Sequence, residues 1–296
     1  MLEKLNFNKK CYLFFNIREL FTIGHFHNIV TSYDTNLPAD LFMELASETR
    51  CAILLMLKEK PTRTNKLAKD LNLTVQETHR NTSRLTETGI IRKDSEGLFS
   101  LTQYGELIVD QIQYYQFLFK HQKFFEDHSC DLPPKFKQRL AVLNNCELIT
   151  KVTNVQQRIK KIESEAKDHI KLIVSQAWED EGKILLDRVK HGVKVSTIFG
   201  FDSVMPDEIV DNIQKKLTSF IQKGSLEQKI VDGNVKISLF IADRQAAVMF
   251  PNQKGEVDMN TLFVGKDPEF YEWCNDYFEY LWNAAKIIVK GRTKFY

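Results

Sequence analysis

The sequence of 296 residues predicts a mixed α+β and α/β protein with more than one domain. Two observations carry this prediction. Short helical patterns between residues 38 and 102 end in a pair of short strand-like runs, and after residue 169 apolar strand-like runs alternate with amphipathic helices. The alternating pattern is typical of an α/β domain. The chain is also long enough for two domains of roughly 100–200 residues each.

The composition is that of an ordinary globular protein and excludes several classes. Apolar residues make up 43% and charged residues 27%, and no run reaches the roughly 20 apolar residues that span a membrane. The five cysteines are widely spaced without a CxxC pair, which argues against disulfides and against a zinc site. We therefore expect a cytoplasmic protein without a metal or cofactor. The net charge is only +2, so any case for nucleic-acid binding rests on local features.

Four zones follow one another along the chain. They are an N-terminal extension, a small helical domain with a hairpin, a helical linker or dimerisation segment, and an α/β domain, at residues 1–37, 38–102, 103–145 and 146–296. The extension has a basic start and an apolar patch, as signal peptides do. Because Arg18 and Glu19 interrupt the patch and no small-residue cleavage site follows, we favour an additional helix or arm.

A helix is predicted over residues 75–88. Thr74 and Glu77 have the T-x-x-E spacing of a capping box, and Gly89 is a good C-terminal stop. At 100° per residue, one face of this helix packs inward. Its residues are Thr78, Asn81, Thr82 and Leu85.

The opposite face of the same helix carries polar side chains suited to base edges and phosphates. A pair of short strands with a DSEG turn follows, with basic residues at its base. The expected DNA contacts are Thr74, Gln76, His79, Arg80, Ser83, Arg84, Arg92 and Lys93. For His79 and Gln76 the alternative is plain solvent exposure. For Arg80 it is a solvated side chain or an intramolecular ion pair, and for Lys93 it is an ordinary charge on the hairpin.

These elements together resemble the winged helix-turn-helix of ArsR-like and MarR-like transcriptional regulators. The carrying stretch is LASETRCAILLMLKEKPTRTNKLAKDLNLTVQETHRNTSRLTETGIIRK. The resemblance implies a homodimer that reads double-stranded DNA with the helix at 75–88 in the major groove. Thr78 and Thr82 depart from it, because the family more often has Val and Leu there. The alternative is a winged helix used for protein contacts, since residues 41–102 hold ten Lys/Arg against eight Asp/Glu.

A long apolar stripe follows the hairpin. It comprises Leu107, Ile108, Ile112, Tyr115, Leu118, Phe119 and Phe125, near helical spacing. Because such a stripe is too apolar to remain in water, we favour a dimerisation helix. A connector that packs against its own chain is the alternative.

The C-terminal half contains a strand–helix–strand unit at residues 170–176, 178–192 and 193–199, which predicts a parallel strand pair. A helix at about 205–223 follows. The runs LEQKIV and VKISLFIADRQAAVMF are strand-like, the latter as a hairpin that turns at Asp243–Arg244, and a last helix begins at an Asp cap.

This half resembles the effector domain of archaeal methanogenesis regulators of the Fil type. The resemblance rests on NCELI, on KLIVSQAW…LLDRVKHGVKVSTIF, on VKISLFIADRQAAVMFPNQKGEVDMNTLFVG and on FYEWCNDYFEYLWNAA. Related TrmB-type regulators have effector domains that resemble phospholipase D halves. The H-x-K-x4-D motif of that chemistry is incomplete here, because His169 and Lys171 are followed by Gln176 where the Asp belongs. We therefore expect a regulator and not an enzyme, with a phospholipase-D-like enzyme and a non-DNA adaptor as the alternatives.

A small-molecule effector would bind beyond the C-terminal ends of the strands, as ligands do in open α/β sheets. The candidate pocket residues are Ser175, Gln176, Trp178, Phe199, Asp243 and Arg244. For Trp178 the alternative is packing at the start of a helix, and for Asp243 and Arg244 it is a role in the turn itself.

Overall fold

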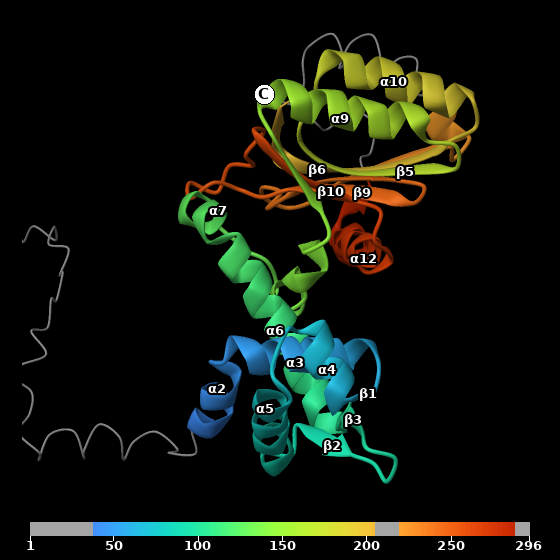
Figure 1. Ribbon diagram of the computed structural model, residues 1–296. Coiled ribbons are helices and arrows are strands. Elements are labelled where there is room, and N and C mark those ends of the chain that lie inside the picture. The colour runs from blue at the N-terminus through green and yellow to red at the C-terminus, as the bar shows by residue number, and fades with distance from the viewer. Residues whose placement is uncertain (1–37, 205–218, 288–296) are drawn as a thin grey trace, which may run out of the picture. The chain divides into compact units, whose positions relative to one another are not determined.

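The computed structural model describes residues 38–204 and 219–287 of the chain (Figure 1). It divides into two compact units, Met1–Glu106 and Leu107–Tyr296. The predicted N-terminal extension and most of the predicted helix at 205–223 lie outside the described residues, although residues 219–222 are helical. The mixed α+β and α/β class predicted from the sequence is confirmed.

The first unit is a helical domain closed by a three-stranded antiparallel sheet of order β1-β3-β2. Its elements are α2 (Ala39–Leu45), α3 (Glu48–Glu59), β1 (Thr62–Arg63), α4 (Thr64–Asp70), α5 (Val75–Glu87), β2 (Ile91–Lys93) and β3 (Leu98–Leu101). Strands β2 and β3 form the hairpin that the sequence predicted. The sequence did not predict β1, because two residues are too short to show a strand period.

The core of this unit is made by the apolar positions of its helices. The fully buried members include Ile53, Leu54, Leu67, Leu85 and Ile90. The turn between α4 and α5 requires Asn72 in the left-handed region, at φ 54°, which Asn adopts at lower cost than most residues. Helix α5 ends where Gly89 takes φ 71°. These two turns, one before and one after α5, set the direction in which the helix lies against the core.

The second unit is built on an eight-stranded mixed sheet of order β11-β7-β6-β5-β8-β9-β10-β4. Its strands are β4 (Glu147–Thr150), β5 (His169–Gln176), β6 (Lys194–Val204), β7 (Leu226–Ile230), β8 (Ser238–Ala242), β9 (Gln245–Met249), β10 (Thr261–Gly265) and β11 (Lys286–Ile287). The predicted parallel pair is confirmed: β5 and β6 are parallel, and β7 continues the parallel part. Strands β8 and β9 form the predicted hairpin.

Helices cover both faces of this sheet (Figure 1). Helices α9 (Val152–Glu165) and α10 (Glu179–Lys190) lie on one face, and α12 (Pro268–Ala284) lies on the other. Strand β8 shows why: Phe240 and Ala242 join the core below α9 and α10, whereas Leu239 and Ile241 join the core with α12. A strand buried on both faces needs a continuous apolar run, and SLFIA is one.

The helical segment between the domains contributes to the core of the second unit. It comprises α6 (Gln103–Lys120), α7 (Gln122–Asp127), α8 (Pro134–Lys137) and the 3₁₀ helix η1 (Leu140–Leu143). Phe117, Phe136 and Leu143 are buried in the same cluster as α12. The sequence predicted boundaries after residues 102 and 145. The structure divides its units after Glu106, close to the first of these, and packs residues 117–143 with the sheet.

Candidate nucleic-acid interface and regulatory cavity

Helix α5 begins at the predicted capping box. The Thr74 hydroxyl accepts a hydrogen bond from the Glu77 N–H at 3.1 Å and donates to Oε2 of Glu77 at 2.9 Å, while the Thr74 N–H donates to the same oxygen at 3.0 Å. The pKa of Glu77 is lowered by these bonds to Thr74, first the one from its backbone. The Thr74 side chain therefore forms the start of the helix, and its expected contact with DNA stays a prediction.

The inward and outward faces of α5 are as predicted. Thr78, Asn81, Thr82 and Leu85 are buried. Thr78 and Thr82, the two departures from the family pattern, satisfy their hydroxyls on backbone carbonyls of Thr74 and His79. A Thr in this core therefore leaves no unpaired hydroxyl, which is what makes it tolerable there.

Four of the expected contacts keep their side chains available on the outer face. Gln76, His79 and Arg80 are exposed and Ser83 is half-buried. No hydrogen bond or ion pair within the described part of the chain involves their side chains. Arg80 also borders a polar hollow of about 270 Å³ together with Ser47, Thr49 and Arg50. The free polar surface of α5 is thus concentrated between Gln76 and Ser83.

Arg84 is placed differently from its neighbours. Its Nε lies 3.2 Å from Oε2 of Glu44, and Nη2 bonds the other carboxylate oxygen. Glu44 also has Nε of Arg50 at 2.9 Å from Oε2, and only 7% of its side chain is exposed. Arg84 is thus paired inside the unit while half of its side chain stays exposed, and its expected DNA contact stays a prediction.

The hairpin carries mixed charge. Arg92 donates from Nε to the Ser100 hydroxyl at 3.3 Å, and Nζ of Lys93 lies 5.4 Å from the centre of the Phe99 ring. Both remain exposed at the base of the hairpin. At its tip, Asp94 holds the turn by accepting the N–H groups of Glu96 and Leu98. An acidic tip repels phosphate, so any DNA contact of the hairpin belongs to its base.

The predicted stripe on α6 and α7 separates into two faces. Ile112 is buried, and Leu118 and Phe125 pack against the core of the second unit. In contrast, Leu107, Tyr115 and Phe119 are 60%, 55% and 83% exposed. The segment is therefore partly the connector that packs against its own chain, and partly an exposed apolar face.

The structure separates the expected effector-pocket residues into two groups. Ser175, Gln176 and Trp178 lie at the C-terminal end of β5, whereas Asp243 and Arg244 lie beside His169 at its start. About six residues of strand, roughly 20 Å, separate the two groups. At the C-terminal end, Ser175 bonds the Ser238 hydroxyl at 2.8 Å, Trp178 and Phe199 pack with the core below α9 and α10, and Gln176 is exposed. A single pocket lined by all six residues is excluded.

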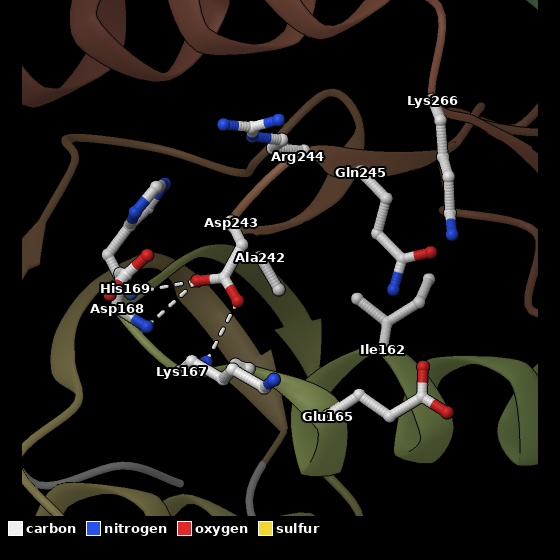
Figure 2. A pocket seen from close by; sticks show the side chains of 11 residues that line it. Ile162, Glu165, Lys167, Asp168, His169, Ala242, Asp243, Arg244, Gln245 and Lys266 are labelled. Carbon is white, nitrogen blue, oxygen red and sulfur yellow. Dashed lines mark hydrogen bonds between the residues drawn. The ribbon is translucent and has the colours of Figure 1, made fainter.

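Asp243 and Arg244 border a cavity of about 600 Å³ (Figure 2). Its lining residues are Ile162, Glu165, Ala166, Lys167, Asp168, His169, Ala242, Asp243, Arg244, Gln245 and Lys266. They come from the end of α9, the start of β5, the turn between β8 and β9, and the residue after β10. The sequence missed Lys167 and Lys266, because nothing in their local pattern relates them to a turn at residue 243.

Asp243 organises one wall of this cavity. Its carboxylate accepts the backbone N–H groups of Lys167, Asp168 and His169 at 2.8, 2.9 and 3.2 Å, as the dashed lines in Figure 2 show. Burial alone would raise the pKa of Asp243, but these three bonds outweigh it and the pKa is lowered. Asp243 also takes φ 49° in the hairpin turn. The alternative of turn chemistry thus accounts for Asp243, while Arg244 remains at the cavity.

The residues of the incomplete phospholipase D motif are bonded to α12. Nε2 of His169 lies 3.0 Å from the Tyr271 hydroxyl, and Nζ of Lys171 donates to Asn275 and Glu279 at 2.7 Å each. These bonds hold the start of β5 to the helix behind the sheet. They give both side chains a structural role.

Neither a metal site nor a membrane-spanning helix is found in residues 38–204 and 219–287. No group of three or more His, Cys, Asp or Glu side chains there is arranged to hold a metal ion. No helix of that part is long and apolar enough to cross a membrane.

Two family models match the chain. Residues 154–284 match the model described as "Methanogenesis regulatory protein FilR1, middle domain". Residues 39–118 match the model described as "HVO_A0261 N-terminal domain". The first model covers most of the sheet with α9, α10 and α12. The second model covers the elements of the first unit from α2 onward and most of α6. No curated protein matches the sequence significantly.

Several solved structures are similar to the chain at low identity. The archaeal chromatin protein TrmBL2 is 14% identical over 88% of this chain and 98% of its own, with a TM-score of 0.40. NucT from Helicobacter pylori is 14% identical over 49% of this chain and 99% of its own, with a TM-score of 0.37. The phospholipase D family member Nuc from Salmonella typhimurium is 14% identical over 49% and 97%, with a TM-score of 0.36. With TM-scores this low, none of these similarities carries an argument about function.

Proposed function

We propose that this chain is a DNA-binding transcriptional regulator of the cytoplasm that reads double-stranded DNA with α5 and is controlled through its second unit. The observation that carries the proposal is the outer face of α5. Gln76, His79, Arg80 and Ser83 offer donors and acceptors there that no other described residue uses. Side chains of this kind, on the second helix of a helix-turn-helix, suit base edges in the major groove.

The matches to family models support the regulatory part of the proposal. The matched FilR1 domain belongs to a protein described as regulatory, and it covers the α/β unit, where the bonds of His169 and Lys171 to α12 leave no phospholipase-like pair. The two units together suit a regulator better than an enzyme. The resemblance of the first unit to ArsR-like proteins belongs to the same proposal.

Replacement of Arg80 tests the DNA contact. DNA fragments retained by the purified full chain are first sequenced to define a site, and affinity is then measured across a salt series. Arg80→Ala is expected to weaken binding to the selected site by about 1–3 kcal/mol if Arg80 reads a base, or to reduce the salt slope by about one if it contacts a phosphate. Both effects require that helix α5 contacts the DNA.

Arg188→Ala is the matched control. Arg188 lies on α10 and is paired with Asp187, so its loss removes the same charge far along the chain from α5. Equal affinities of Arg80→Ala and Arg188→Ala for the selected DNA would contradict the proposal, provided that circular dichroism shows both variants folded. Failure of the wild-type chain to retain any DNA would contradict it as well.

We further propose that the chain acts as a homodimer through α6. One recognition helix covers only a few base pairs, so two joined copies hold DNA better than one. Tyr104, Leu107, Tyr115 and Phe119 are exposed and lie within about 120° of one another around α6, at 100° per residue. This face is contiguous and apolar, and a second copy of the same helix would cover it symmetrically.

The dimer is tested by mass in solution. Light scattering of the wild-type chain is expected to give twice the 34.6 kDa of one chain, and Phe119→Glu is expected to give a single-chain mass. Phe201→Glu is the control, because Phe201 is 79% exposed and lies on β6 away from α6. A wild-type monomer, or a Phe119→Glu dimer of unchanged affinity, would refute this arrangement.

A further inference from the structure

We infer that the cavity between the end of α9, the β8–β9 turn and Lys266 binds a small organic anion that carries a carboxylate or phosphate on an apolar body. The inference deepens the proposed function, since regulation by this ligand rests on the chain being a regulator. Binding of the anion itself does not depend on DNA. The two are therefore tested separately.

The lining of the cavity includes three cationic side chains, and all three are exposed. Lys167, Arg244 and Lys266 line it, and none of them forms a side-chain hydrogen bond or ion pair with a described residue. They come from the start of β5, the hairpin turn and the residue after β10. In Figure 2 the Lys266 side chain extends alongside the Gln245 amide toward Ile162. An anion in the cavity could form charge-assisted hydrogen bonds with side chains from separate elements.

The carboxylates of the lining do not cancel this charge. Asp243 is bound by three backbone N–H groups, and Glu165 lies 3.8 Å from Nζ of Lys161 on the same helix. Asp243 keeps its charge, because the N–H groups lower its pKa, and Asp168 is an exposed carboxylate. With Glu165 paired to Lys161, the lining keeps three positive groups against two negative groups.

The apolar part of the lining is the reason why we infer an apolar body in the ligand. Ile162, Ala166 and Ala242 contribute to the lining and belong to helix α9, to its end and to strand β8. A cavity of about 600 Å³ lies within the roughly 300–1,000 Å³ of small-molecule sites, which combine apolar walls with a few polar groups. An inorganic anion would leave the apolar floor uncovered.

The cavity is also connected to the framework of the unit. Asp243 joins the hairpin turn to the first residues of β5, and His169 joins those residues to Tyr271 on α12. A ligand that bridges Arg244, Lys167 and Lys266 would therefore clamp α9, the hairpin and β10 onto the start of β5. This contact would stabilise the second unit against unfolding.

The test is the unfolding midpoint of the second unit in the full chain, without DNA. All three tryptophans, Trp178, Trp273 and Trp282, lie in this unit, so their fluorescence reports on it selectively. Phenylphosphate, benzoate, inorganic phosphate and phenol are added at one ionic strength. Phenylphosphate or benzoate is expected to raise the midpoint by about 2–4 °C, inorganic phosphate less, and phenol least. The stronger of the first two identifies the anionic group.

Lys266→Gln is expected to weaken binding of the stronger anion about tenfold, the loss of one charge-assisted contact. Lys167→Gln serves the same purpose if Lys266→Gln does not fold. Lys254→Gln is the control, because Lys254 is exposed in the loop after β9 and is not part of the lining. Equal effects of the anions and phenol, or anion binding that Lys266→Gln and Lys167→Gln leave unchanged, would overturn the inference. Neither result bears on Arg80 and DNA.

Discussion

The Arg84 guanidinium, on helix α5, is bonded to the Glu44 carboxylate on α2, with Nε 3.2 Å from Oε2. Its hydrogen bond to Arg84 is the main cause of the lowered pKa of Glu44, and the Arg50 charge adds to it. Arg50 also donates to the Met43 carbonyl at 2.8 Å. These contacts tie the short helix α2 to α3 and α5. Arg84 is therefore a group that positions α5.

Glu44→Gln is expected to destabilise the first unit by about 2 kcal/mol, because Arg50 and Arg84 lose a charged partner whose side chain is only 7% exposed. Far-UV circular dichroism in urea measures the loss. Glu48→Gln is the control, because Glu48 is exposed at the start of α3 and forms no ion pair with a described residue. Unchanged stability of Glu44→Gln would show that Arg84 is available for other contacts after all.

Thr74→Ala is expected to cost about 1 kcal/mol of stability, since the first turn of α5 loses its N-cap acceptor. Thr74→Ser keeps the hydroxyl and should recover most of that energy. DNA affinity at temperatures well below unfolding should change little in either variant, because the hydroxyl is used within the capping box. A large loss of affinity in a fully folded Thr74→Ala protein would assign Thr74 a direct DNA contact.

Two buried carboxyls between α9 and α10 make stability depend on pH. Burial raises the pKa of Glu163, and the charge of Glu181 raises it further. Burial raises the pKa of Glu181 to about 7, against a normal value of 4.5. The folded state thus binds more protons than the unfolded chain. The contribution of this pair to the free energy of unfolding is therefore largest near and below pH 4.5, and that contribution is lost as the pH rises toward 7 and beyond.

Glu163→Gln is expected to flatten this decline and to raise stability at pH 8 by at least about 1.4 kcal/mol, the equivalent of one pKa unit. Urea unfolding followed by tryptophan fluorescence at several pH values measures it. Glu165→Gln, on an exposed neighbour at the end of α9, should leave the pH profile unchanged. A wild-type profile that rises between pH 5 and pH 8 would have the opposite sign and contradict the account.

Asp243→Ala is expected to cost about 3 kcal/mol, roughly one for each of the three N–H bonds that it removes. Asp243→Asn should cost less, because Asn tolerates the positive φ of this turn and keeps one acceptor oxygen. The urea midpoint of tryptophan fluorescence separates the two. If both variants match the wild type, the Asp243 carboxylate does not organise the start of β5.

Much of the fold follows from local patterns in the sequence. The capping box at Thr74 and Glu77, the buried face of α5, the parallel pair β5–β6, the hairpin at Asp243–Arg244 and the Asp267 cap of α12 are all decided within a few residues. Such features depend on hydrogen bonds and side-chain periods over one or two turns. The outward direction of Gln76 and Arg80 follows from the same period.

The tertiary structure alone decided which of these side chains are free. Arg84 shares the outer surface of α5 with Arg80, but it is paired with a residue 40 positions earlier in the chain. Lys266 joins Arg244 at the cavity only because β10 lies beside β9 in the sheet. The sequence determines the residues that a helix or turn presents. Burial and charge pairing bring together distant segments, so the available residues emerge only when the chain is folded.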